Sequence, residues 1–244
     1  MKELGNFQNE ENSFYIGVNE LGDFETGLIN YNKSTAKLIS KEIISKKTTK
    51  ILDFGAGKGT LTEIISKDLN VSIDCLEIDM KLKQELSSKK FKVRNPDEDL
   101  NNCYNYIYSS NVLEHIKNDE EEIIKLRNYL TFDGKIILYL PANQKLYSDF
   151  DFRVGHYRRY NKKELVDLLE KLGFKIEKIH YVDSLGYLAA LLFKYKSIFT
   201  KNSNISMFNL KLYDRAIFPV SILLDKIGAK HLVGKNLFVA AKKL

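Results

Sequence analysis

Short β-rich runs alternate with helical patterns along most of the chain. We expect strands at residues 49–54, 71–77, 91–94, 104–109, 135–140, 174–182 and 236–241. A first helix is expected at 34–45. Four more are expected: from the end of the glycine run to Lys67, from the end of the second strand to about Ser88, beyond Asn118, and from Asn161 to Gly173. Asn161 and Glu164 have the spacing of a capping box. This alternation is typical of a parallel sheet covered by helices on both faces, so it predicts a doubly wound α/β fold.

Two segments fall outside the alternation and are expected to cover the rim of the sheet. They are residues 1–48 and residues 184–234, and the second is largely helical in pattern. Because the last β-rich run returns to the sheet after the second segment, one domain fits better than two. We predict a single domain of residues 1–244, divided into an N-terminal cap (1–48), a core (49–183), a helical cap (184–234) and a last strand (235–244).

Charge is distributed unevenly along the chain. The whole sequence has a formal net charge of +6, but residues 1–183 carry net −2 and residues 184–244 carry net +8. The slightly acidic core argues against an extended phosphate-binding face, so no nucleic acid is expected as a partner. The lysines of the helical cap are expected to face water, or alternatively to meet an anionic membrane or an acidic, lipid-linked acceptor.

The sequence contains few signals for export or metal binding. No apolar run follows the first residues, and the longest uncharged apolar stretches have nine residues, about half of a bilayer span. A cytoplasmic location is therefore expected. Cys75 and Cys103 are too few for a disulfide framework and are expected to be buried free thiols. No cluster of His, Cys and carboxylates has ligand spacing, so no metal ion is expected.

A glycine-rich run, Gly55-Ala56-Gly57-Lys58-Gly59, joins the first predicted strand to a helix. Such a turn lets a ligand approach the backbone at the edge where open α/β sheets bind nucleotides. Thr60 stands where a dinucleotide fingerprint needs its third glycine or alanine, and the P-loop pattern is absent. Asp53 would repel a pyrophosphate but suits a cationic amine. Glu77 ends the second predicted strand, where a carboxylate can accept both hydroxyls of a ribose.

Residues 50–140 resemble the class I S-adenosylmethionine-dependent methyltransferases. The resemblance is carried by the glycine motif, by Glu77 and by the signature Ser110-Asn111-Val112-Leu113-Glu114-His115. It implies S-adenosylmethionine as cofactor, S-adenosylhomocysteine as product, and a Rossmann-like sheet of seven strands in the order 3-2-1-4-5-7-6 with the last strand antiparallel. The cofactor-binding residues that it implies are Asp53, Gly55, Ala56, Gly57, Gly59, Glu77, Ile78, Asp97, Asn111 and Tyr31.

The resemblance extends into a subgroup of small-molecule methyltransferases often associated with glycan and natural-product pathways. It is carried there by segments at 140–142, 146–151 and 155–160, and by Asn30-Tyr31-Asn32 upstream. Pro96 stands where the simplest alignment puts an adenine-binding Asp, and the role is therefore carried over to Asp97. The acceptor-binding residues that the resemblance implies are Asp149, Tyr157, Arg158 and Tyr160.

Methyl transfer from a sulfonium mainly needs in-line alignment and exclusion of water. If the acceptor is a hydroxyl or a protonated amine, a general base would increase the rate of methyl transfer by about 10²-fold to 10⁴-fold. His156 is the first candidate for this base. Its alternative role is structural, with its side chain holding its loop to Asp149 or Asp151. His115 is the second candidate, or else it shapes the cofactor pocket.

The predicted function is O- or N-methylation of a small molecule, with no protein partner implied. Two alternatives stay open: a non-catalytic protein that binds S-adenosylmethionine, and a nicotinamide-dependent dehydrogenase, against which Thr60 argues.

Overall fold

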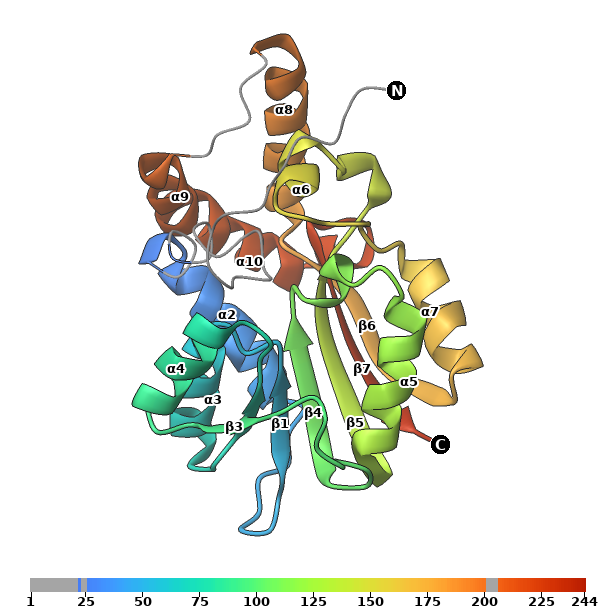
Figure 1. The fold of residues 1–244 in the computed structure, drawn as a ribbon. Coiled ribbons are helices and arrows are strands. Elements are labelled where there is room, and N and C mark those ends of the chain that lie inside the picture. Colours follow the sequence, from blue (N-terminus) through green and yellow to red (C-terminus); the bar gives the residue numbers. More distant parts are fainter. Residues whose placement is uncertain (1–21, 23–25, 201–205) are drawn as a thin grey trace, which may run out of the picture.

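The β-rich runs form one sheet in the computed structural model, which describes residues 22, 26–200 and 206–244. Its strands are β1 (Ile51–Phe54), β2 (Asp74–Leu76), β3 (Lys92–Arg94), β4 (Tyr104–Ser110), β5 (Leu130–Pro141), β6 (Phe174–Val182) and β7 (Asn236–Lys243). They lie in the order β3-β2-β1-β4-β5-β7-β6 (Figure 1). The first five strands pair in parallel, whereas β7 is antiparallel to both β5 and β6. The predicted strand order is confirmed.

Helices flank the sheet and extend beyond its upper end in Figure 1. They are α2 (Ile29–Ser40), α3 (Thr60–Leu69), α4 (Met80–Ser88), α5 (Asp119–Tyr129), α6 (Asp149–Arg153), α7 (Lys162–Lys171), α8 (Ser184–Thr200), α9 (Met207–Leu212) and α10 (Phe218–Lys226). A π-helical turn, Tyr213–Ile217, joins α9 to α10, and 3-10 turns lie at Leu113–His115, Gln144–Leu146 and Ala229–His231. The described part of 184–234 is thus helical, as predicted.

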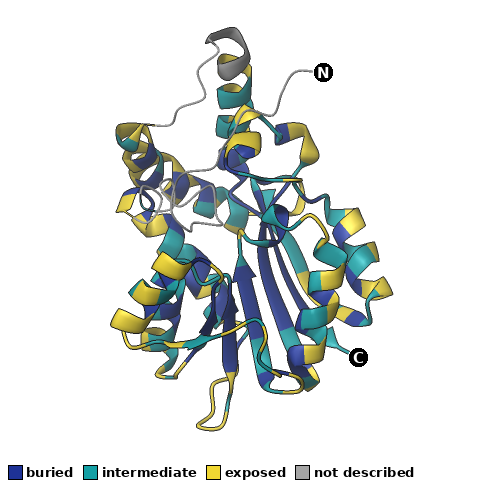
Figure 2. Ribbon diagram, in the orientation of Figure 1, coloured by how far each residue is buried: buried dark blue, intermediate teal, exposed yellow. Residues whose placement is uncertain are grey.

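Each central strand contributes side chains to two hydrophobic cores, one on either face of the sheet. On β5, Ile136 and Leu138 belong to one core, while Ile137 and Tyr139 belong to the other. All four are fully buried. Because successive strand residues point to opposite faces, this run of apolar residues requires cover on both sides. Figure 2 shows the resulting buried sheet between helices whose outer faces are exposed.

The N-terminal helix α2 differs from its prediction, because it begins at Ile29 and ends at Ser40 rather than covering 34–45. Its early start has a tertiary cause. The carboxylate of Asp214, in the π-helical turn, accepts hydrogen bonds of 2.9 Å from the backbone amides of Asn30 and Tyr31. These amides belong to the first turn of the helix and have no partner within it. A carboxylate far along the chain therefore stabilises this end of α2.

The predicted capping box at α7 is wrong, although Asn161 is the N-cap residue. Its side-chain amide donates to Glu164 Oε2 at 3.1 Å and makes no bond to the helix backbone. A capping box forms at α6 instead, where the amide and hydroxyl of Ser148 donate to Asp151 Oδ2 at 2.9 and 3.0 Å. Asp151 is therefore fixed at the start of α6.

Asp183 joins the end of β6 to the helical cap. Its carboxylate accepts a bond of 3.0 Å from the amide of Gly186 in the first turn of α8. A Cβ at Gly186 would lie 2.0 Å from Asp183 Oδ2, so this approach requires glycine. The carbonyl of Asp183 also accepts the amide of Lys235 at 3.0 Å. This residue therefore fixes the start of α8 and the approach to β7 at one place.

Both cysteines are free, as predicted, although Cys75 is buried and Cys103 only half-buried. Among the described residues, no helix combines the length and the apolar composition needed to cross a membrane.

We expect Asp214→Ala to lower the free energy of unfolding by about 2 kcal/mol, because two amides of α2 lose their acceptor. Chemical denaturation measures this change. Asp167→Ala, at an exposed position on α7, is the matched control and should stay within about 0.5 kcal/mol of the unmodified protein. Equal stability of the two variants would contradict the role of Asp214.

Candidate active site

A cavity of about 560 Å³ opens at the carboxyl ends of the parallel strands. Open α/β sheets bind ligands at this edge. The predicted site residues that line it are Tyr31, Asp53, Gly55, Ala56, Glu77, Ile78, Asn111, His115 and His156. The sequence therefore identified residues that the fold brings to one place.

The glycine loop turns sharply between β1 and α3. Gly55 has a φ of +75°, and a Cβ at this position would lie 2.3 Å from Val112 Cγ2. Gly59 also has a positive φ, and it begins α3. These two positions need glycine because the backbone is left-handed there and, at Gly55, approaches the segment after β4 closely. The loop consequently exposes backbone to the cavity.

Glu77 is held against this loop by backbone amides. Its Oε2 accepts from Gly57 at 2.9 Å, and its Oε1 accepts from Ile78 at 2.7 Å and from Asp79 at 3.0 Å. The residue is buried and lines the cavity. Gly57 itself does not line the cavity, so it acts here by orienting the Glu77 carboxylate.

Asp53 lies buried at the end of β1 and lines the same cavity. Its Oδ2 accepts from the hydroxyls of Thr62 at 2.5 Å and Tyr108 at 2.8 Å. Burial raises the pKa of Asp53 to about 7, although these two hydrogen bonds act in the opposite direction. A cation bound beside this carboxylate would compensate for the burial of its charge.

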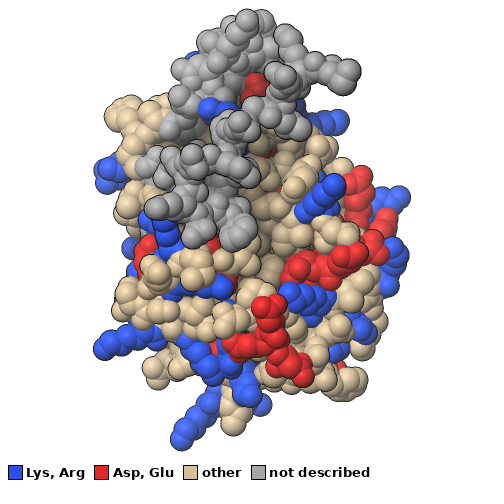
Figure 3. All heavy atoms as spheres, viewed as in Figure 1, with Lys and Arg blue, Asp and Glu red and all other residues tan. Residues whose placement is uncertain are grey.

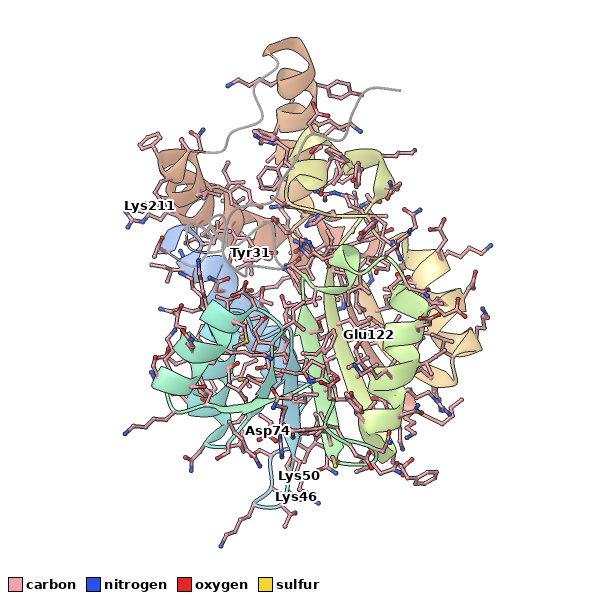
Figure 4. All side chains as sticks on the ribbon, viewed as in Figure 1. Tyr31, Lys46, Lys50, Asp74, Glu122 and Lys211 are labelled. Carbon is pink, nitrogen blue, oxygen red and sulfur yellow. The ribbon has the colours of Figure 1, made fainter. Side chains whose placement is uncertain are left out.

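Tyr31 and Asn111 line the cavity on its other side. Asn111 has a φ of +54° and donates its amide to the carbonyl of Tyr139 at 2.9 Å. The Tyr31 ring packs edge-on against Tyr139, with 5.9 Å between ring centroids. Figure 4 labels Tyr31 between α2 and the cap helices. Its buried position therefore connects the sheet edge with the cap.

Glu114, His115 and His156 meet on the cavity wall and form what we call the histidine cluster. The two imidazole rings pack edge-on at 4.5 Å between centroids, and His156 Nε2 lies 3.9 Å from Glu114 Oε1. Both carboxylate oxygens of Glu114 are buried without a hydrogen-bond partner. Burial raises the pKa of Glu114 to about 8 and lowers the pKa of His115 to about 4. At neutral pH both groups are therefore mostly uncharged.

Asp151 fixes the orientation of His156. Its Oδ1 lies 2.9 Å from His156 Nδ1 and also accepts from Arg159 Nε at 2.9 Å. Burial alone would raise the pKa of Asp151, but the bond with His156 and the charge of Arg159 outweigh it and lower the pKa to about 2. An ionised Asp151 accepts a hydrogen bond from Nδ1–H of His156, so Nε2 of the neutral imidazole is left as an acceptor. The predicted tie between His156 and Asp151 is present.

The histidine cluster has atoms within 4.8 Å of one another, which is a spacing that a metal ion could use. No such cluster was expected from the sequence, because Glu114 and His115 lie far from His156 along the chain. Tertiary structure brings them together, since the amide of Tyr157 donates to the carbonyl of Glu114 at 2.8 Å. That no metal is bound stays a prediction.

The four predicted acceptor residues do not line this cavity. They are Asp149, Tyr157, Arg158 and Tyr160. Asp149 and Tyr157 are exposed, whereas Arg158 and Tyr160 contact Asp119 and border a separate hollow of about 330 Å³. The residues of the same segment that line the cavity are Phe150, Asp151, Val154, His156 and Arg159.

Asp97 is exposed and does not line the cavity, but Pro96 directly before it does. Sequence reasoning also missed Lys235, which lines the cavity just before β7. A signal for it existed: the amino end of an antiparallel last strand lies at the same edge as the carboxyl ends of the parallel strands. A lysine at this point of the sequence is therefore a candidate for the site.

A family profile described as a methyltransferase domain matches residues 29–179. A comparison with curated proteins found no match.

Solved structures share the fold at low sequence identity. Phosphoethanolamine N-methyltransferase 2 of Haemonchus contortus, in complex with S-adenosyl-L-methionine, is 18% identical with a TM-score of 0.59, covering 95% of this chain and 60% of its own. A SAM-dependent methyltransferase of Archaeoglobus fulgidus is 18% identical (TM-score 0.54, covering 87% and 94%). The [4+2]-cyclase SpnF is 12% identical (TM-score 0.57, covering 95% and 97%). This chain thus spans less than two thirds of the Haemonchus protein.

Removing one hydrogen bond should shift the titration of Asp53 measurably. We expect Thr62→Val to raise the pKa of Asp53 by about one unit from about 7, because a bond to the charged form is lost. Carbon-13 NMR of the carboxyl group, assigned with Asp53→Asn, measures it. Thr48→Val, at an exposed position, is the control and should leave the pKa unchanged. A lower pKa in Thr62→Val would contradict the assigned contact.

Proposed function

We propose, since this chain belongs to the methyltransferase domain family, that it transfers the methyl group of S-adenosylmethionine to an oxygen or nitrogen atom of a small-molecule acceptor. The observation that carries this proposal is the pair of buried Asp151 and half-buried His156 on the cavity wall. The fold alone does not carry it, because a [4+2]-cyclase has a similar fold. The family match leaves the dehydrogenase alternative without support.

The residues at the β1 and β2 end of the cavity fit S-adenosylmethionine. Asp53 would hold the cationic amino group, because both hydrogen bonds that it accepts from the described residues go to Oδ2 and leave Oδ1 for a ligand. Glu77, fixed by three backbone amides, would hold the ribose hydroxyls. Gly55 and Ala56 bring the backbone of the glycine loop to the wall of the same cavity. When bound, the cofactor supplies a methyl carbon that is already activated by a sulfonium.

His156 is proposed to accept the proton that the acceptor loses. Its Nε2 faces the interior of the histidine cluster, and Asp151 and Arg159 hold the ring in that orientation. A hydroxyl proton would pass to Nε2 as the oxygen is methylated, whereas an ammonium proton would pass to Nε2 first and so free the lone pair that the nitrogen needs to accept the methyl group. Glu114, fully buried and mostly protonated at neutral pH, keeps the surroundings dry without adding a negative charge.

Replacing His156 should separate chemistry from cofactor binding. We expect His156→Ala to retain S-adenosylmethionine affinity in calorimetry but to slow methyl transfer by about 10²-fold to 10⁴-fold. The protein is incubated with methyl-labelled cofactor and a small-molecule extract. Transfer is measured as the amount of label that appears in molecules other than the cofactor. Glu77→Ala is the complementary variant, because it should lose affinity for the cofactor. Glu63→Ala, on the surface of α3, should change neither.

The outcomes of this experiment distinguish the alternatives. A wild-type rate in His156→Ala would reduce His156 to a positioning role for its loop. Cofactor binding without labelled product from any extract would favour a non-catalytic binding protein. A metal ion held by Glu114, His115 and His156 would occupy the same Nε2 atom, so loss of activity with a chelator would contradict proton transfer to His156.

The nature of the partners also belongs to this proposal. Figure 3 shows acidic side chains gathered on the α5 side of one face, and the first turn of α5 carries Asp119 and residues 120–122, all Glu. That acidic surface supports a small-molecule acceptor over nucleic acid. A cytoplasmic location stays a prediction from the sequence.

Membrane contact through residues 184–234 is the remaining prediction about partners. The cap exposes large apolar side chains, including Leu192 (71% exposed), Phe208 (73%) and Ile227 (76%), near its lysines. We expect the protein to sediment with vesicles containing phosphatidylserine but not with pure phosphatidylcholine, and less so as salt rises. Phe208→Ser should weaken binding, whereas Phe132→Ser, at an equally exposed position near the start of β5, should not. Equal binding to neutral vesicles would contradict this.

A further inference from the structure

Lys235 is a cavity-lining residue whose ammonium group makes no ion pair and no side-chain hydrogen bond with the residues that the structure describes. Its Nζ lies instead over two aromatic rings, 5.9 Å from the Tyr31 centroid and 5.4 Å from the Tyr213 centroid. Lys58, Lys125 and Arg159 also line the cavity, and Arg159 and Lys125 are paired with Asp151 and Glu122. Lys235 thus differs from them in having its charge available.

The surroundings of Lys235 remove it from water. Burial lowers its pKa, and the charge of Asp183 acts in the opposite direction. Asp183 is already engaged, because its carboxylate accepts from the amide of Gly186 and from the hydroxyl of Tyr213. A buried cation without a counter-ion is unfavourable, and an anionic ligand would relieve that cost.

Lys235 lies at the opposite end of the cavity from Asp53 and Glu77, the two carboxylates proposed to hold the cofactor. In the sheet order, β4 and β5 stand between β1 and β7, so three spacings of about 4.8 Å separate the β1 and β7 backbones by roughly 14 Å. The carboxylate of S-adenosylmethionine shares a carbon with the amino group assigned to Asp53. This separation favours the methyl acceptor over the cofactor as the source of an anion at Lys235.

The walls around Lys235 are aromatic and held in place. Tyr31 packs against Phe218 at 5.2 Å between centroids, and Tyr213 packs against the same ring at 6.4 Å. Asp214, which follows Tyr213, holds the backbone amide of Tyr31 at 2.9 Å. An anion with an apolar or planar body next to it would therefore meet both a charge and a preformed apolar surface.

We propose that Lys235 binds an anionic group of the methyl acceptor, a carboxylate or a phosphate, between the rings of Tyr31 and Tyr213. This inference rests on the proposed function, since it names the class of acceptor that the same cavity takes. The basic helical cap above the cavity is compatible with an acidic acceptor.

Binding of simple anions tests the proposal without turnover. The protein is saturated with S-adenosylhomocysteine and titrated by calorimetry with benzoate, phenyl phosphate or neutral benzamide. We expect both anions to bind more tightly than benzamide, and Lys235→Met to weaken anion binding about tenfold or more while sparing benzamide. Lys226→Met, at an exposed position of the cap, is the control and should bind all three as the unmodified protein does. Tighter benzoate binding indicates a carboxylate acceptor, and tighter phenyl phosphate binding indicates a phosphate.

Three results would overturn the proposal. They are absence of anion binding to the unmodified protein, an equal loss for benzamide in Lys235→Met, and loss of S-adenosylhomocysteine affinity with anion binding unchanged. The last would assign Lys235 to the cofactor. His156→Ala should retain anion binding although it loses methyl transfer. Anion binding therefore tests Lys235 separately from the chemistry proposed for His156.

Discussion

The antiparallel pairing of β7 between β5 and β6 determines where the rest of the molecule lies. Asn236 pairs with Pro141 at the end of β5 and with Val182 at the end of β6. The chain leaves β6 and re-enters β7 at one edge of the sheet, so the segment between them must lie over that edge. The same edge carries the glycine loop and Glu77. Strand pairing therefore places the cap over the cavity, where the hydrogen bonds of Asp214 attach it to α2.

Charges in the cavity are arranged in sequence along this edge. Asp53 and Glu77 lie at the β1 and β2 end, Glu114 lies on the wall and is mostly neutral because burial raises its pKa to about 8, and Lys235 lies beside β7. An ionised Asp151 stands behind His156, compensated by Arg159. The cavity thus offers negative charge to a cationic ligand at one end and positive charge to an anion at the other, with fixed groups between them.

A feature could be predicted from the sequence where residues close together along the chain determine it. The strand order and the position of Gly55 and Glu77 at the cavity depend on short motifs, which a family resemblance carries over. The start of α2 could not be predicted, because Asp214 stabilises it from far along the chain. In the segment after β5 the sequence pointed to Asp149 and Arg158, yet their neighbours Phe150 and Arg159 line the cavity. Backbone direction decides which of two adjacent residues faces inward, and no residue type reports it.

Asp214 accepts hydrogen bonds from two backbone amides of α2. It attaches the first turn of α2, and with it Tyr31, to the turn that carries Tyr213. Any displacement that lifts this turn must carry α2 along or break both hydrogen bonds. The rings of Tyr31 and Tyr213, which lie on the two elements that these bonds join, therefore keep their spacing around Lys235 when α2 and the turn move as one body.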